Sequence, residues 1–403
     1  MILNKQAQRG LVAIAALSSF SLAAFAADSF TEALTGGKAS GNLRYRYETV
    51  AQKNALKDAK ASTLRLRLGY ETAEYQGFGA FVEAEHLTTL GSESYNSTIN
   101  GKGTYSVVAD PEFTEINQSY LSYSGLANTR IKYGRQRLLL DNQRFVGNVG
   151  WRQNEQTFDA FTVVNQSLPD TTITAGYISN VNRVFSDDSA AGNFHMKSPI
   201  VNASYKGLSA GELTGYAYFL DFVDAPAMSS RTLGLRFTGA QTLDDGLKLP
   251  YAIEYAKQSD YKKNPANYDV DYLLLEGGLA RGVHSVKLGY EKLEGNGSNA
   301  FQTPLATLHA FNGWADMFLA TPAAGLKDAY LAAGTAAYEV KFNAVYHDYR
   351  AENTSARYGT EWDMQATKGF GKHYVVGIKY ADYKAKTFAV DTRKFWLWGE
   401  VKF

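Results

Sequence analysis

The chain has 403 residues, no cysteine and a formal net charge of +1 at pH 7. The near-zero charge predicts no general attraction to nucleic acid, and the missing cysteines exclude a fold held by disulfide bonds. Aromatic residues make up 13% of the chain, glycine is abundant at 36 and proline is scarce at 8. This composition is typical of strands with aromatic girdles and glycine-containing turns, in a membrane barrel or in a soluble periplasmic all-β fold.

The first 26 residues have the pattern of a secretory signal peptide. Lys5 and Arg9 form a positive start, an apolar stretch follows, and Ala24 and Ala26 supply the small residues before a cleavage point. The apolar stretch is shorter than the ~20 strongly apolar residues of a membrane anchor. We therefore expect a secreted protein whose residues 27–403 form one domain.

From residue 41 onward, apolar and polar residues alternate with period two, which predicts β-strands. In the first two predicted strands the apolar face consists of Leu43, Tyr45, Tyr47, Leu64, Leu66, Leu68 and Tyr70. The opposite face carries Arg44, Arg46, Arg65 and Arg67. In a soluble sandwich the apolar face would form the core, whereas in a membrane barrel it would face lipid and the charged face would line a watery lumen.

The lengths of the connections favour the barrel. Short turns are predicted at residues 75–77, 125–128, 166–170, 207–211, 243–246, 280–282 and 371–372. Long polar stretches alternate with them, at residues 88–114, 139–153, 182–198, 261–268 and 295–322. Short turns on one rim and long loops on the other are typical of a transmembrane antiparallel β-barrel with periplasmic turns and extracellular loops. We count about eighteen strands, or sixteen if the alanine-rich Asp328–Ala337 segment is a loop.

The last predicted strand is amphipathic up to the final residue. One face carries Phe395, Leu397, Gly399, Val401 and Phe403, and the other carries Glu400 and Lys402. A strand that ends in this way resembles the signal that the outer-membrane assembly machinery recognises. We therefore expect that machinery and the outer-membrane lipid bilayer as partners of the protein, in a Gram-negative bacterium.

Basic residues concentrate in the first 152 positions, and we take them as candidate pore-lining residues. They are Arg44, Arg46, Arg65, Arg67, Arg130, Lys132, Arg135, Arg137, Arg144 and Arg152. Because a guanidinium group binds a carboxylate with two parallel hydrogen bonds, such a wall would favour anionic solutes. In the alternative interpretation these residues pair with Glu48, Glu83, Glu85, Glu115 and Asp141 and only fill the lumen.

No pattern in the sequence predicts catalysis. The six histidines show no metal-ligand spacing, and the sequence lacks Gly-x-Ser-x-Gly, a phosphate-binding loop and a dinucleotide fingerprint. We therefore expect no catalytic site, cofactor or metal. Residues 301–319 are too apolar for a solvated loop, so we expect them to fold over or into the pore, or to pack on the rim.

Two segments, residues 133–154 and 301–316, resemble the alginate-export family of outer-membrane porins. The resemblance implies an eighteen-stranded, monomeric barrel with an arginine-rich pore, and passage of anionic sugar polymers in the founding member. Our leading hypothesis is passive diffusion of anionic solutes through the arginine-lined lumen. Export of an acidic, alginate-like polysaccharide is the first alternative. The second is a surface adhesin or structural barrel that uses loops 88–114 and 295–322.

Overall fold

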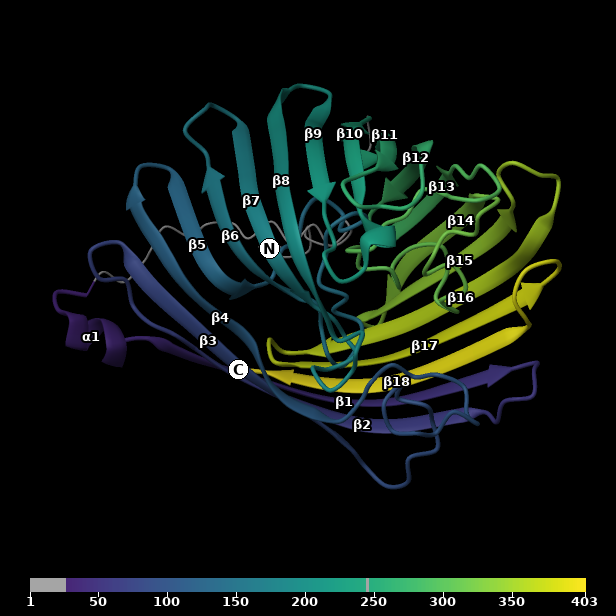
Figure 1. The fold of residues 1–403 in the computed structure, drawn as a ribbon, viewed down its shortest axis with the longest axis horizontal. Coiled ribbons are helices and arrows are strands. Elements are labelled where there is room, and N and C mark those ends of the chain that lie inside the picture. Colours follow the sequence, from purple (N-terminus) through teal and green to yellow (C-terminus); the bar gives the residue numbers. More distant parts are fainter. Residues whose placement is uncertain (1–26, 244–245) are drawn as a thin grey trace, which may run out of the picture.

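The computed structural model describes residues 27–243 and 246–403. The predicted signal peptide, and two residues of the turn predicted at 243–246, lie outside the described residues. The described part contains one antiparallel sheet of eighteen strands, in which strands adjacent in sequence pair with each other. The first and last strands, β1 and β18, also pair, which closes the sheet into a barrel (Figure 1).

The bounds of the elements confirm the predicted strand count of eighteen. The strands are β1 Lys38–Gln52, β2 Ala59–Glu71, β3 Phe78–Thr89, β4 Phe113–Leu126, β5 Thr129–Gln136, β6 Thr157–Asn165, β7 Thr171–Asn182, β8 Asn193–Leu208, β9 Gly211–Leu220, β10 Ser230–Thr242, β11 Lys248–Asp260, β12 Asp269–Arg281, β13 His284–Leu293, β14 Leu326–Ala337, β15 Val340–Arg350, β16 Arg357–Phe370, β17 Tyr374–Ala385 and β18 Thr392–Lys402. The helices are α1 Phe30–Thr35 and a short 3-10 helix η1, Pro226–Met228. The alanine-rich segment that left sixteen strands open is strand β14.

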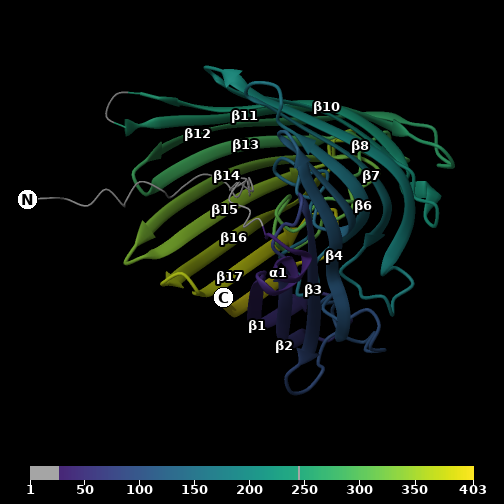
Figure 2. The same ribbon diagram turned by 90° about the vertical axis from the view of Figure 1, so that its left-hand side faces the viewer.

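Helix α1 lies beyond the strands at the end of the barrel where β1 begins (Figure 1), which is the end that faces the viewer in Figure 2. The Ser29 hydroxyl caps it by accepting a hydrogen bond from the Glu32 amide at 3.2 Å. The Tyr70 hydroxyl on β2 holds the helix against the barrel by donating to the Leu34 carbonyl at 2.6 Å. Neither helix of the described part is long and apolar enough to cross a membrane.

The two faces of the strands differ as the alternation predicts. On β2, Leu68 is 53% exposed on the outer face, whereas the neighbouring Arg67 is buried inside the barrel. On β18, Leu397 is exposed outside and Trp396 is completely buried inside. A closed sheet satisfies its own backbone hydrogen bonds, so an apolar outer face of this kind can lie in the hydrocarbon of a bilayer.

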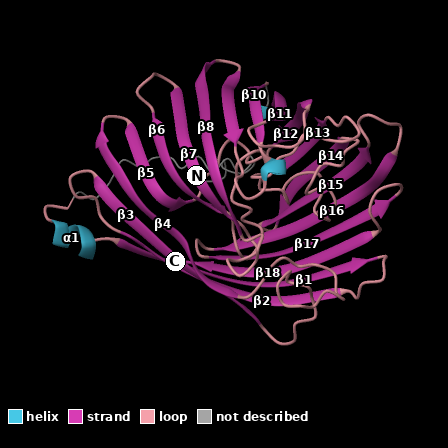
Figure 3. Cartoon of the chain, viewed as in Figure 1, coloured by secondary structure: helices cyan, strands magenta, loops and turns pink. Residues whose placement is uncertain are grey.

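Connections at one end of the barrel are short, and three at the other end are long. The long loops comprise residues 90–112, 137–156 and 294–325. Figure 3 shows loop segments crossing the space that the strands enclose. The long loops thus replace the wide open lumen that a bare ring of eighteen strands would leave.

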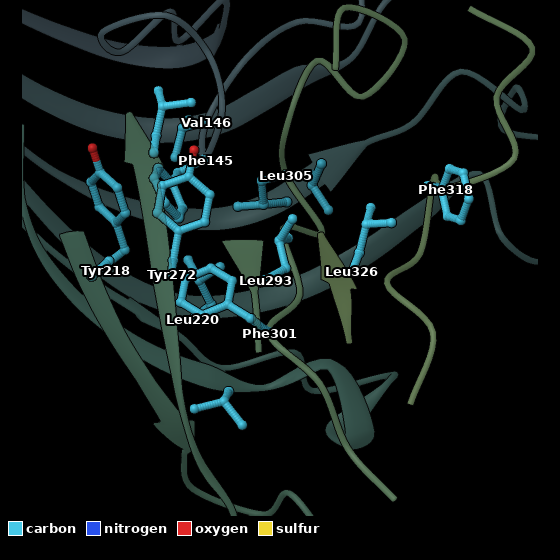
Figure 4. Packing of buried hydrophobic residues seen from close by; sticks show 14 of the residues in the cluster. Phe145, Val146, Tyr218, Leu220, Tyr272, Leu293, Phe301, Leu305, Phe318 and Leu326 are labelled. Atoms are coloured by element: carbon cyan, nitrogen blue, oxygen red, sulfur yellow. The ribbon is translucent and has the colours of Figure 1, made fainter. Parts of the chain in front are cut away.

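Loops 137–156 and 294–325 meet inside the barrel. Val146 and Leu305 form an isolated parallel bridge, and the Gly147 amide donates to the Leu305 carbonyl at 2.9 Å. Their apolar side chains pack with residues of the wall, among them Phe145 against Tyr272 (Figure 4). Phe301 and Leu305 are buried in this cluster. The prediction that residues 301–319 fold into the pore is therefore confirmed, and the alternative, in which they pack on the rim, is wrong.

Candidate lumenal site

Four arginines form the centre of a basic wall on the inner face of β1 and β2. The register places Arg44 directly opposite Arg65, with Arg46 and Arg67 at the neighbouring inward positions. All four side chains are buried. Like charges directly opposite each other on a sheet destabilise it unless other groups compensate, so the surroundings of these guanidinium groups decide what they can do.

Carboxylates from strands and loops compensate most of this charge. Arg67 places its Nε 2.9 Å from Glu85 on β3 and its Nη1 3.1 Å from Glu155 in loop 137–156. Arg46 pairs with Asp110 of loop 90–112, and Glu48 lies 3.4 Å away. Two of the three long loops therefore contribute an acid to the basic wall.

Arg44 has a different environment. Its Nε donates to Gln153 Oε1 at 2.8 Å, and its Nη groups donate to the carbonyls of Gly150 at 3.2 Å and Trp151 at 3.3 Å. Among the described residues, no carboxylate oxygen lies within 4.0 Å of this guanidinium. Neutral oxygens of loop 137–156 therefore accept the hydrogen bonds of Arg44, although the geometry of a guanidinium group also suits a carboxylate.

Glu155 anchors this loop to the basic wall. Its carboxylate pairs with Arg67 and Arg137, and it accepts hydrogen bonds from the amides of Asn117 and Asn148, each at 2.6 Å. Burial alone would raise the pKa of Glu155, but the two arginines outweigh it and hold that pKa well below its usual range. The carboxylate of Glu155 therefore stays ionised at neutral and at mildly acidic pH.

Asp110 has a similar role. It faces Arg46 and Arg152, and it accepts a hydrogen bond from the Gln153 amide at 2.9 Å. Burial acts to raise its pKa, but these three donors leave the pKa of Asp110 below its usual value. Loops 90–112 and 137–156 are thereby joined to each other as well as to the wall.

The other lumenal candidates also have acidic partners. Arg152 lies 3.0 Å from Glu48, and Arg137 lies 2.7 Å from Glu83. Arg144 reaches across to β13 and pairs with Glu291 at 2.7 Å. The structure thus brings Arg137 and Arg152 to the basic wall and places Arg144 away from it.

Arg130 and Lys132 lie further along β5. Arg130 is 3.8 Å from Glu71, and the Lys132 ammonium lies 4.3 Å from the centre of the Tyr120 ring. Both are only partly buried, so they are more accessible than the four central arginines.

Arg135 corrects the prediction for this region. It lies on the same face of β5 as Tyr133, which is 68% exposed on the outside of the barrel. Its guanidinium pairs with Asp159 at 2.9 Å and donates to the Ile116 carbonyl at 3.1 Å. The prediction that Arg135 lines the lumen is wrong. Successive side chains of a strand point to opposite faces, so Arg135 points outward, whereas Arg130 and Lys132, an odd number of positions away, point inward.

The alternative in which acids neutralise the arginines holds in part. Glu48, Glu83 and Glu85 pair with arginines as that interpretation expects. Glu115 instead accepts a hydrogen bond from the Asp187 amide at 2.9 Å, and Asp141 accepts one from Asn202 at 2.7 Å. The partners Asp110, Glu155 and Glu400 come from parts of the chain that the sequence did not connect with the arginines.

An acidic wall, which sequence reasoning missed, lies on strands β11 to β16. Its inward carboxylates are Glu254, Glu276, Glu291, Asp328, Glu361 and Asp363. Glu361 accepts a hydrogen bond from the Ala315 amide at 2.6 Å, and Asp363 accepts one from the Trp314 amide at 3.0 Å. The acidic wall therefore holds loop 294–325, as the basic wall holds loop 137–156.

An eighteen-stranded barrel with an apolar outside and a charged, loop-constricted inside defines the class of outer-membrane β-barrels. Solved structures with this fold include OccAB2 of Acinetobacter baumannii, with 15% identity, a TM-score of 0.73, and 92% of this chain and 99% of that chain covered. OpdQ of Pseudomonas aeruginosa is similar over 91% of this chain and 98% of its own, with 17% identity and a TM-score of 0.71. The outer membrane protein opdK of Pseudomonas aeruginosa gives 15% identity, a TM-score of 0.71, and coverage of 92% and 99%.

The sequence profile of the family described as alginate export matches residues 38–281, which is more than half of the chain. The chain therefore belongs to the alginate-export family, and its closed barrel with an apolar outer face is the architecture of a Gram-negative outer-membrane protein. The matched range includes segment 133–154 of the resemblance noted from the sequence, but not segment 301–316. No curated protein matches the chain.

Proposed function

We propose that this protein is an outer-membrane channel, and not an enzyme, that passes solutes bearing carboxylates along the basic wall. The observation that carries the proposal is the environment of Arg44. Its donors are directed at Gly150, Trp151 and Gln153 of an inserted loop, with no carboxylate of its own in contact among the described residues. In the proposal, the oxygens of this loop stand in for the oxygens of a solute carboxylate.

The chemistry of the guanidinium group favours replacement of the loop oxygens by a solute carboxylate. When the acceptor is an ionised carboxylate and not a neutral carbonyl, Coulomb attraction adds to the hydrogen bond from the guanidinium, and the two planar groups fit each other in bidentate geometry. A carboxylate that reaches Arg44 therefore competes well with the loop carbonyls. Arg65, opposite Arg44, and Arg67 beyond it continue the same wall and give the solute successive partners.

Export of an acidic polysaccharide remains the second candidate, because the chain matches the alginate-export family. The chemistry of recognition is shared, since a polyuronate presents repeated carboxylates to the same arginines. Permeation of a single uronate but not of its oligomers would favour a channel for small solutes. We propose that the protein works as a monomer in either case.

Permeation through reconstituted protein tests the role of Arg44. In a liposome-swelling assay, Arg44→Gln is expected to slow the entry of glucuronate about tenfold, because a charge-assisted hydrogen bond contributes about 1.5–3 kcal/mol. Entry of the neutral sugar glucose should not slow. The matched control is Arg350→Gln, whose side chain is 62% exposed at the end of β15. An equal loss for both sugars, or no loss for glucuronate, would contradict the proposed role.

A further inference from the structure

Lys379 lies between the indole rings of two tryptophans that come from two different loops. It is on the inner face of β17 and is buried. Its ammonium lies 3.9 Å from the ring centre of Trp151, in loop 137–156, and 4.0 Å from that of Trp314, in loop 294–325. One side chain of the wall therefore contacts both inserted loops through their aromatic faces.

The surroundings of Lys379 tie the same loops to the wall. The ammonium donates to His309 Nε2 at 3.0 Å, and the His309 ring stacks on Trp151 with ring centres 5.0 Å apart. His309 Nδ1 lies 2.7 Å from Asp316, whose other carboxylate oxygen lies 2.6 Å from Lys394 on β18. This chain of contacts runs from β17 through loop 294–325 to β18.

The inserted loops supply the direct contacts of the Lys379 ammonium. Among the described residues, no carboxylate oxygen lies within 4.0 Å of this ammonium, so the two rings and one imidazole nitrogen are its nearest partners, and the Trp396 ring of β18 lies further away at 5.8 Å. A cation on an aromatic face gains about 2 kcal/mol when both are removed from water. Withdrawal of either tryptophan would remove such a contact and admit water to the ammonium.

Trp151 connects this arrangement to the basic wall. Its side chain holds Lys379, and its backbone carbonyl accepts hydrogen bonds from Arg44 and Arg46. Loop 137–156 is also bridged to loop 294–325 at Val146 and Leu305. The two loops are therefore coupled to each other, and their departure from the lumen would uncover the arginines.

We propose that Lys379 is a latch: the Trp151–Lys379–Trp314 sandwich keeps loops 137–156 and 294–325 closed over the basic wall. The arrangement in the structure is the closed state. Opening requires the ammonium to leave the two rings, after which both loops move as one unit and expose Arg44. The latch controls whether a solute can reach the basic wall, which is a separate property from the type of solute that the wall binds.

The test uses a single introduced cysteine as a reporter of loop position, because the chain has no native cysteine. Thr63→Cys suits this purpose, since Thr63 is 1% exposed and its hydroxyl accepts a hydrogen bond from Gln153 of the loop at 2.9 Å. N-ethylmaleimide is the probe. It is neutral, so the loss of the Lys379 charge does not itself change its rate of approach.

In the Thr63→Cys background, Lys379→Met is expected to raise the labelling rate at least tenfold. Lys379→Arg should keep labelling slow, because a guanidinium also stacks between indole rings. Trp314→Leu should reproduce the fast rate and serves as the second variant if Lys379→Met fails to fold, which the heat-dependent gel mobility of the barrel reports. A reporter at the exposed Lys102 should label at one rate in every background.

An unchanged rate in folded Lys379→Met and folded Trp314→Leu would overturn the latch. An equally fast rate in Lys379→Arg would also overturn it, since filling of space rather than the cation would then hold the loops. Labelling reports the position of the loops and not the identity of the solute. Failure of the latch is therefore distinguishable from failure of the proposed channel function.

Discussion

Replacing Glu155 by glutamine is expected to free loop 137–156 from the basic wall and to raise the single-channel conductance severalfold. The buried carboxylate of Glu155 is shared by Arg67 and Arg137. Glutamine preserves the shape but removes the charge, which leaves each arginine with one carboxylate, on Glu85 or Glu83. Each charge-assisted hydrogen bond contributes about 1.5–3 kcal/mol, so losing two shifts the closed–open equilibrium by at least about a hundredfold.

Two readouts follow the loop directly. Conductance in a planar bilayer should rise in Glu155→Gln, and trypsin should cut after Arg152, which is buried in the closed arrangement. The matched control is Glu339→Gln, in the turn between β14 and β15, whose side chain is 84% exposed. If conductance and cleavage stay at the values of the unmodified protein, Glu155 does not anchor the loop.

Mild acid is expected to open the channel through His309. This imidazole is buried in loop 294–325, where burial and the neighbouring Lys379 cation lower the pKa of His309 to about 3, despite the opposing carboxylate of Asp316. The bonding pattern assigns a neutral ring, which accepts from Lys379 and donates to Asp316. In the closed state His309 is therefore uncharged at neutral pH.

The direction of the pH effect follows from proton binding. A solvated His309 in an opened loop would have a pKa near its ordinary ~6.5, so the open state binds the extra proton between about pH 6.5 and 3. The depressed pKa therefore stabilises the closed state above pH 6.5, and this stabilisation is lost as the pH falls toward 3. The loss amounts to about 1.4 kcal/mol per pH unit, or tenfold in the closed–open equilibrium.

The other charged groups near His309 are Asp316 from its own loop, Lys379 from β17 and Arg152 from loop 137–156. The pKa of Asp316 is held below its usual range by Lys394 and His309 against the effect of burial, so Asp316 does not titrate in this window. Open probability in a planar bilayer should rise between pH 6.5 and pH 4.5, and His309→Gln should remove most of that rise. An equal rise in His309→Gln would assign the effect to other groups.

The fold was largely predictable because the two faces of a membrane barrel obey one rule along the whole chain. Period-two alternation located strands as different as the arginine-bearing β1 and the terminal β18, and loop lengths distinguished the two rims. Only β14 was uncertain, because its alanines and glycine carry little contrast between inside and outside. Arg135 was misplaced because a group of nearby basic residues was read as one face, although its parity along β5 points outward.

The site was predictable in part, for a physical reason. Alternation shows that Arg44 and Arg67 face inward, and it nominates Glu85 on the adjacent strand as a partner. Alternation cannot show that Asp110 and Glu155, which lie in loops, contact the same wall, because the side chains of a loop do not alternate between two faces. The latch was missed for the same reason, although four of the five tryptophans, at 151, 314, 396 and 398, lie in the two inserted loops and the last strand.

The proposed function requires that the lumen passes organic anions along the basic wall. The most direct test is the reversal potential of the purified protein in a planar bilayer under a gradient of potassium glucuronate. We predict a potential with the sign of anion permeation in the unmodified protein, and a shift toward zero in Arg44→Gln. A potential with the sign of potassium permeation, unchanged in Arg44→Gln, would contradict the account, because the acidic wall would then determine which ions pass.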